Sequence, residues 1–250
     1  VATFLTSVSS YEGGCGFEDV LNDTVYVIDS GTKSMKKFYR KSFVGSFLLS
    51  NANANRFSLN DSLIFLSANT DSTSFLVIDI DHPNKQIPMG QVIHAKTPFK
   101  TIISNRKHIL YDKERGIFSV SDCYPYIEQY DVYGKHIKTF DLSSIPIIEK
   151  AVNTAKKFSD QEKSVYIYIR DAYLANEHIY ILCSSWDSQG DYKVNSILEL
   201  SINDGMKHVS TYILPHDIYS SFCISDSYLF ASQEGTGTTI EKIKIGNAKK

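Results

Sequence analysis

The sequence lacks the apolar runs and the charge imbalance that would point to a membrane or to nucleic acid. Its longer apolar runs, such as 63–66 and 75–80, fall far short of the roughly 18 to 20 residues that a membrane-spanning helix needs. The 26 basic and 28 acidic residues nearly cancel, and a net charge of -2 produces no long-range field that would gather nucleic acid. We therefore expect no membrane span and no nucleic-acid partner.

Common catalytic and metal-binding signatures are also absent from the sequence. There is no Gly-x-Ser-x-Gly nucleophile elbow and no His-Glu-x-x-His zinc pattern, and the seven histidines are scattered along the chain. The four cysteines form no Cys-x-x-Cys pair, and their spacing fits buried thiols, with one or two disulfides as the alternative; they are Cys15, Cys123, Cys183 and Cys223. We predict no catalytic residue, no metal ligand and no cofactor, and the sequence leaves open whether the protein is an enzyme.

What the sequence does contain is the composition of β-strands. Hydrophobic residues make up 42% and charged residues 22%, which is typical of a globular protein with a sizeable core. The 16 Tyr and 14 Phe lie in short runs among Ile, Val and Thr, whereas there is a single Trp. We predict one domain over residues 1–250.

A short pattern recurs along the chain. Each copy begins at a turn containing polar residues such as Asn, Asp or Ser and continues into an alternating apolar strand. Five copies are legible, at 22–29, 60–67, 106–112, 176–183 and 225–230. Apart from one long gap after the third copy, their spacing is close to the roughly 40 to 50 residues of a four-stranded propeller blade.

A second alternating strand follows each copy and mixes charged with apolar residues. These strands lie at 35–39, 75–80, 127–132, 197–202 and 240–245, and we expect them to be the more exposed strands of each unit. Together the two strand sets predict an all-β fold, a β-propeller of four-stranded antiparallel blades with five legible units.

The long gap contains a predicted helical insertion near 144–158. Ser144 is suited to the N-cap and Pro146 to the first turn. The apolar residues that follow fall on one helical face: Ile148, Ala151, Val152 and Ala155. Removing this insertion brings the spacing of the repeat back toward that of the other units.

The two ends of the chain are expected to complete one blade. The last unit ends near residue 245 without an outermost strand, and the alternating segment 1–8 has no unit of its own. Pairing the two would leave no open sheet edge, which is how closed β-structures avoid edge-to-edge association. The chain begins with Val1 and not with Met, from which we expect a leader to have preceded it.

The third unit is the most regular and carries a resemblance to known propellers. Its segments 116–122, 126–131 and 134–140 resemble the strand, strand, glycine turn, strand order of NHL-type blades. The whole chain resembles the TolB-like propeller families of predicted bacterial envelope lipoproteins, which are commonly six-bladed. This resemblance implies a periplasmic or cell-surface location, a lipid anchor on a removed leader, and a role in recognition.

Two groups of aromatic residues are the predicted ligand-binding residues. Trp186 and Tyr192 lie in an expected loop at 184–192 that is rich in polar donors, and Tyr124 and Tyr126 flank a proline in a second loop. Aromatic faces stack on sugar rings or anchor protein partners at a small entropic cost. The alternative is that these rings pack against a neighbouring blade.

Aspartates recur at the strand ends. Converging carboxylates could hold calcium, but Asp side chains also satisfy the backbone of turns, and we favour that interpretation for Asp29, Asp112, Asp122 and Asp226.

Two functions follow from this sequence. The leading hypothesis is a non-enzymatic binding or scaffold propeller of the bacterial cell envelope, with a protein or glycan partner. The alternative is a metal-dependent hydrolase or lactonase with its active site at the central channel.

Overall fold

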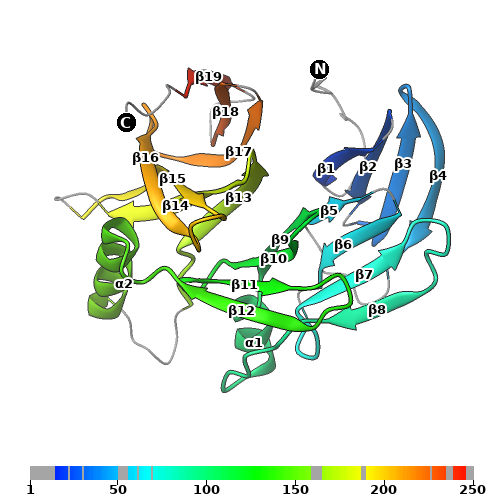
Figure 1. Cartoon of the computed structure of the whole chain (residues 1–250), viewed down its shortest axis with the longest axis horizontal. Helices are drawn as coiled ribbons and strands as arrows, with labels where there is room; N and C mark the ends of the chain where they lie inside the picture. Colours follow the sequence, from blue (N-terminus) through cyan, green and yellow to red (C-terminus); the bar gives the residue numbers. More distant parts are fainter. Residues whose placement is uncertain are drawn as a thin grey trace. The chain divides into compact units, whose positions relative to one another are not determined.

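The structure is a computed structural model, and it describes residues 15–21, 23–29, 31–49, 56–60, 62–68, 70–158, 165–186, 190–225, 227–234 and 239–245. The predictions made for segment 1–8 and for Asp226 lie outside these residues. The described chain forms five antiparallel sheets and two helices (Figure 1).

In every sheet the strands pair in the order in which they follow one another along the chain. Sheet 1 contains β1 (Cys15–Leu21), β2 (Thr24–Asp29), β3 (Ser34–Tyr39) and β4 (Ser42–Leu48). Sheet 2 contains β5 (Phe57–Leu59), β6 (Leu63–Ser67), β7 (Phe75–Asp79) and β8 (Gln86–Met89). Sheet 3 contains β9 (Lys107–Asp112), β10 (Gly116–Ser121), β11 (Tyr126–Tyr130) and β12 (His136–Asp141). Sheet 4 contains β13 (Ile169–Ala175), β14 (His178–Trp186), β15 (Tyr192–Ser201) and β16 (Lys207–Ile213), and sheet 5 contains β17 (Tyr219–Ser225), β18 (Tyr228–Gln233) and β19 (Ile240–Lys244).

Tight turns set the register of these sheets. Arg40 and Lys41, between β3 and β4, have φ of 46° and 72°, and Asn176 and Glu177, between β13 and β14, have φ of 50° and 64°. Two consecutive residues with positive φ are the mark of a type I′ hairpin turn, whose twist matches that of the flanking strands. Gly116 has a φ of 88°, and a Cβ there would overlap the carbonyl oxygen of Tyr130, so only glycine fits.

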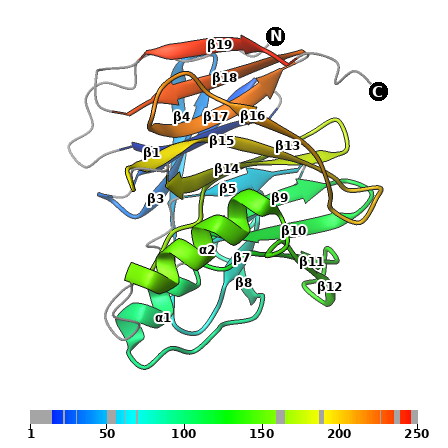
Figure 2. The same ribbon diagram turned by 90° about the vertical axis from the view of Figure 1, so that its left-hand side faces the viewer.

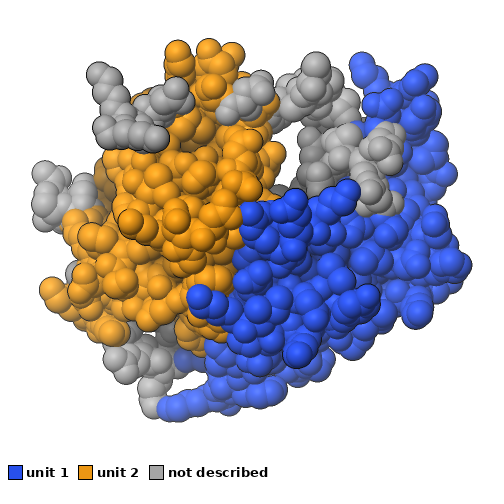
Figure 3. Space-filling model, viewed as in Figure 1, with its two compact units in different colours: residues 1–120, 128–138 blue, residues 121–127, 139–250 orange. Residues whose placement is uncertain are grey.

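The chain divides into two compact units (Figure 3). Unit 1 comprises residues 1–120 and 128–138, and unit 2 comprises residues 121–127 and 139–250. Unit 1 therefore holds sheets 1 and 2 whole, unit 2 holds sheets 4 and 5 whole, and each unit has its own hydrophobic core.

In unit 1 the core lies between successive sheets. Met35 of sheet 1 and Ile64 and Ile78 of sheet 2 belong to one buried cluster, and a second cluster joins sheets 2 and 3. Sheet 3 also contains a buried ion pair, in which Lys107 Nζ lies 3.1 Å from Glu128 Oε2.

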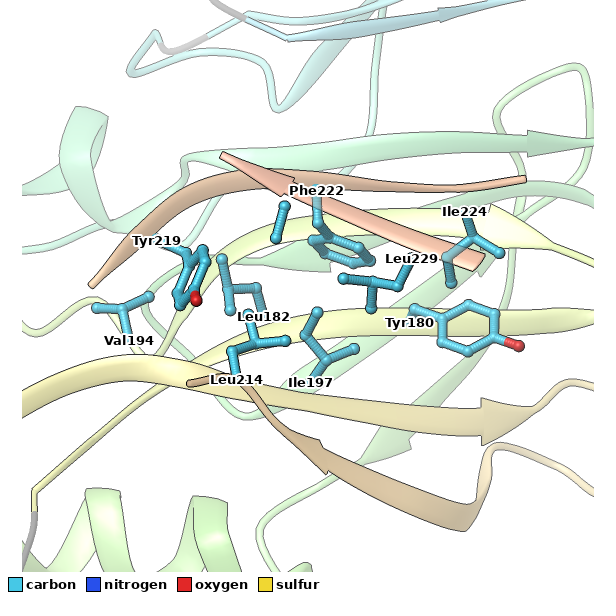
Figure 4. Close-up of a cluster of buried hydrophobic side chains, with 10 residues drawn as sticks. Tyr180, Leu182, Val194, Ile197, Leu214, Tyr219, Phe222, Ile224 and Leu229 are labelled. Atoms are coloured by element: carbon cyan, nitrogen blue, oxygen red, sulfur yellow. The ribbon is translucent and has the colours of Figure 1, made fainter. Parts of the chain in front are cut away.

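In unit 2 the core fills the space between sheets 4 and 5 (Figure 4). Leu182 and Ile197 of sheet 4 meet Phe222 and Leu229 of sheet 5, and each such buried side chain contributes about 1.5–3 kcal/mol. The inner strands of the two sheets are also joined directly, because the backbone N–H of Phe222 donates to Asp171 Oδ2 over 2.9 Å.

The predicted helical insertion is confirmed as α2 (Pro146–Phe158), which packs against β14 (Figure 2). Its buried face contains Ile148, Ala151 and Ala155, as predicted. The N-cap prediction was displaced by one residue, because the helix begins at Pro146 and Ile145, not Ser144, immediately precedes it.

A second helix, α1 (Pro98–Ser104), was not predicted. Thr97 caps it by accepting a hydrogen bond from the N–H of Lys100 over 3.3 Å. Its seven residues are too few for a helical period to show in the sequence. Neither α1 nor α2 is long and apolar enough to cross a membrane.

Two details of the repeat were predicted wrongly. The third copy, at 106–112, forms the first strand of its sheet, whereas the other four copies form second strands. In sheet 3 the second strand is β10. The helices α1 and α2 then account for the longer spacing on either side of sheet 3. The strands expected to be more exposed include β7 and β15, which are largely buried. β7 packs against sheet 1 and sheet 3, and β15 packs against sheet 5.

Candidate functional site

The turn between β10 and β11 presents Tyr124 and Tyr126 as a stacked pair. Their ring centroids are 5.7 Å apart and the rings are inclined by 14°. The N–H of Tyr126 donates to the carbonyl of Tyr124 over 2.8 Å and closes a three-residue turn with Pro125 at its centre. The fixed φ of proline is close to the φ that the central residue of such a turn needs. Both rings are half-buried, so one part of each packs on the protein and another part is open to a ligand.

A third tyrosine joins this turn from the segment that precedes β13. The N–H groups of Tyr168 and Ile169 both donate to the carbonyl of Asp122, over 2.7 and 3.1 Å. Burial raises the pKa of Tyr168, and the neighbouring groups of Cys123, Tyr166 and Tyr124 raise it further. The hydroxyl of Tyr168 therefore stays protonated at neutral pH and can donate a hydrogen bond.

Trp186 and Tyr192 lie opposite each other at the ends of β14 and β15. Their rings meet edge to face, with centroids 5.5 Å apart and an interplanar angle of 65°. The hydroxyl of Tyr192 lies 2.9 Å from the buried Ser184 Oγ. Residues 184–186 and 192 of the expected loop thus belong to strands, and residues 187–189 lie outside the described residues.

Backbone hydrogen bonds connect the two aromatic pairs within unit 2. Tyr168 donates to Asp122 just before the Tyr124 turn, and its carbonyl accepts from the N–H of Ser184, two residues before Trp186, over 2.8 Å. The three segments therefore adjoin one another, although they are far apart in the sequence. We call Tyr124, Tyr126, Tyr166, Tyr168, Trp186 and Tyr192 the aromatic cluster.

Charged groups lie beside the Tyr192 end of the aromatic cluster. Lys193 Nζ is 2.7 Å from Asp217 Oδ2, and the N–H of Val194 donates to the carbonyl of Asp217 over 2.7 Å. The cluster thus combines accessible aromatic faces, hydroxyl groups and a nearby ion pair, which is a combination suited to binding.

Sequence reasoning found four members of the aromatic cluster but missed Tyr166 and Tyr168. They belong to the alternating run Val165-Tyr166-Ile167-Tyr168. Its period of two was the available signal, but only the folded chain shows that the run adjoins the Tyr124 turn.

Two of the recurring aspartates, Asp29 and Asp112, serve their turns, as predicted. Asp29 accepts from the N–H of Thr32 over 3.1 Å, and its ion pair with Lys36 is the main cause that lowers the pKa of Asp29 to about 2. Asp112 accepts from two successive N–H groups, at 2.9 and 2.8 Å. Within the described part of the chain, no group of three His, Cys, Asp or Glu side chains is arranged to hold a metal ion.

Three of the four cysteines, Cys123, Cys183 and Cys223, are free thiols. Cys123 and Cys183 are buried, and Cys223 is half-buried. Burial raises the pKa of the Cys223 thiol to about 11, with a smaller contribution from the charge of Asp171. Burial also raises the pKa of the Cys183 thiol, so Cys183 and Cys223 are protonated at neutral pH.

Comparison with known proteins adds information about the fold alone. No protein-family model and no curated protein sequence matches the chain. The chain is similar in structure to a streptogramin B lyase, with a TM-score of 0.56 and 9% identity, over 92% of this chain and 68% of that protein. It is similar to catalytically inactive virginiamycin B lyase from Staphylococcus aureus with quinupristin, with a TM-score of 0.56 and 9% identity, over 96% and 73% of the two chains.

The WD40 propeller domain of Doa1 is a third similar structure, with a TM-score of 0.52 and 13% identity. The match covers 86% of this chain but only 59% of that one. The described residues form five blades, the number legible in the repeat, and not the six that the resemblance to TolB-like families implies. Together with the antiparallel order of strands in each sheet, these likenesses show that the protein has an all-β fold, a β-propeller.

Proposed function

We propose that the protein is a non-enzymatic binding propeller of the bacterial cell envelope that recognises a glycan or protein partner through the aromatic cluster of unit 2. The proposal extends to a periplasmic or cell-surface location. The fold does not select this function by itself, since similar structures include both lyases and a WD40 domain.

The observation that carries the proposal is the edge-to-face pair of Trp186 and Tyr192. Tyr192 is 42% exposed although its hydroxyl lies within hydrogen-bonding distance of a buried serine, so its ring is held in place while a large area stays accessible. A ring positioned in this way loses little conformational entropy when a ligand binds.

The polar groups of the cluster favour a ligand with alternating apolar and hydroxyl surface, such as a sugar. Ring faces take the C–H side of a sugar, and the hydroxyls of Tyr168 and Tyr192 can exchange hydrogen bonds with its hydroxyl groups. A protein partner would use the same rings as anchors.

The experiment is a binding screen of the purified chain against an array of bacterial cell-wall oligosaccharides and against a detergent extract of bacterial envelope. Hits are then measured by calorimetry with Trp186→Ala and Tyr124→Ala. Loss of an anchor worth about 2 kcal/mol weakens binding roughly 30-fold. Trp186→Phe should retain part of the affinity, because it keeps an aromatic face.

The matched control is Tyr133→Ala, since Tyr133 is 84% exposed and lies outside unit 2. We expect its binding to equal that of the wild type. The proposal fails if no glycan or extract component binds, or if the two cluster variants bind every hit as well as the control does. Fractionation of cells that produce the native protein checks the location, and recovery in the cytoplasm would contradict it.

A further inference from the structure

The outer edge of β4 differs from the other outer strands in containing neither a charged residue nor a proline, and its register against β3 shifts at Val44. Natural edge strands carry charged residues or proline, because their unpaired backbone groups otherwise recruit another chain. Pro88 lies in β8, β12 and β16 each contain a lysine, and β19 contains two lysines and a glutamate. β4, with the sequence Ser-Phe-Val-Gly-Ser-Phe-Leu, has neither charge nor proline.

β4 also exposes large apolar side chains. Phe43 is 55% exposed, Val44 57% and Leu48 74%. Among the described residues β4 pairs with β3 alone, and it is the last strand of its sheet (Figure 1). The strand thus leaves both its backbone edge and its side chains available.

The hydrogen-bond pattern identifies which backbone groups face outward. The N–H of Leu49 donates to the carbonyl of Lys33 over 2.9 Å, so residue 49 faces β3. Because the pattern alternates along an antiparallel strand, Leu48 and Ser46 direct their N–H and C=O groups away from β3. The side chain of Gln86 already donates to the carbonyl of Leu48 over 3.0 Å, as expected of an outward group.

Basic residues stand at both ends of this edge. Arg40 and Lys41 form the exposed turn at its start, and the exposed Lys33 lies opposite its end. Asp23 lies 4.0 Å from Arg40, but both side chains are largely exposed and such a pair is weak. The edge is therefore apolar in the middle and positively charged at its ends.

This charge pattern decides between the two kinds of occupant. In a symmetric dimer two β4 edges would pair antiparallel, which would bring the Arg40–Lys41 turn of one copy toward Lys33 of the other. Like charges opposed in this way oppose pairing. We propose that the β4 edge binds an extended segment of another protein, with alternating apolar residues flanked by acidic ones, by adding it as a further strand to sheet 1.

The test uses a labelled synthetic peptide, Asp-Glu-Val-Thr-Val-Thr-Val-Glu-Asp, and a counterpart with lysine at its four acidic positions. Fluorescence anisotropy should show that the chain binds the acidic peptide at least about tenfold more tightly than the basic one, and less tightly as salt rises. Ser46→Pro removes an outward N–H that β3 does not use and should weaken binding of the acidic peptide at least about tenfold.

Val44→Glu is the second variant, because it places a repelling charge on the edge without touching the backbone. Ile213→Glu is the matched control on β16, at a position that is 66% exposed, and should bind like the wild type. If Ser46→Pro lowers the melting temperature markedly, Val44→Glu decides. Trp186→Ala should leave peptide binding unchanged, which separates this inference from the proposed function of the aromatic cluster.

Three results would overturn the inference. One is the absence of binding to the acidic peptide, or equal binding to the two peptides. Another is equal affinity of Val44→Glu and Ile213→Glu. The last is a dimer in sedimentation experiments that Ser46→Pro dissociates, since the edge would then belong to a second copy of the chain.

Discussion

The buried ion pair of sheet 3 offers a stability test whose size follows from the structure. The side chain of Lys107 is 1% exposed and that of Glu128 is 7% exposed, and their charged atoms are 3.1 Å apart. Glu128 lies on β11, whose first residue is Tyr126 of the aromatic cluster. The pair therefore helps to hold the strand that leads out of the Tyr124 turn.

Removing one partner leaves the other as a buried charge without this counter-ion. We expect Lys107→Met and Glu128→Gln each to reduce the free energy of unfolding by about 3–5 kcal/mol. Replacing both by apolar residues of similar volume, Lys107→Met with Glu128→Leu, removes both charges and is expected to cost only about 1 kcal/mol, since such replacements are often close to neutral.

The assay is guanidinium and thermal unfolding followed by far-ultraviolet circular dichroism. For a chain of this size 1 kcal/mol corresponds to roughly 2–4 °C in melting temperature, so each single variant should melt about 6–20 °C lower. The reasoning is refuted if either single variant loses less than about 1 kcal/mol, or if the double variant loses as much as the two single variants added together.

Three further predictions concern a glycine, the ion pair of Asp29 with Lys36, and a thiol. Gly116→Ala should cost at least about 1–2 kcal/mol from its positive φ and more from overlap with the facing carbonyl, whereas Gly205→Ala, with open space around it, should lose only the backbone part in the same unfolding assay. Because the pKa of Asp29 is lowered from 3.8 to about 2, its stabilisation should be complete above about pH 4 and lost as the pH falls through 2; an acid titration of Lys36→Met that keeps this loss would contradict the assignment. Burial raises the pKa of the Cys183 thiol, so it should react with a thiol reagent at pH 8 only after unfolding, and rapid labelling of Cys183 in the native protein would show that the strand opens.

The fold was predictable because its signals are local. Strand periodicity and turn residues depend on neighbours in the chain, so β2, β6, β14 and β18 were located from the sequence, and so was the amphipathic face of α2. The place of the third copy within its sheet could not be predicted, because residues 106–112 and β10 both alternate and both are bounded by turns. Only the pairing order of sheet 3 distinguishes a first strand from a second.

The sequence by itself determined the repeat, its all-β character, and the aromatic and polar residues from which a binding site could be made. Tertiary structure decided which of those residues meet, since hydrogen bonds between distant segments bring Tyr168 beside the Tyr124 turn and Ser184 beside Tyr168. It also decided that β4 is an exposed outer strand, because exposure and pairing are properties of the assembled sheet. Local preference acts over a few residues, whereas a site depends on contacts that form only when the sheets pack together.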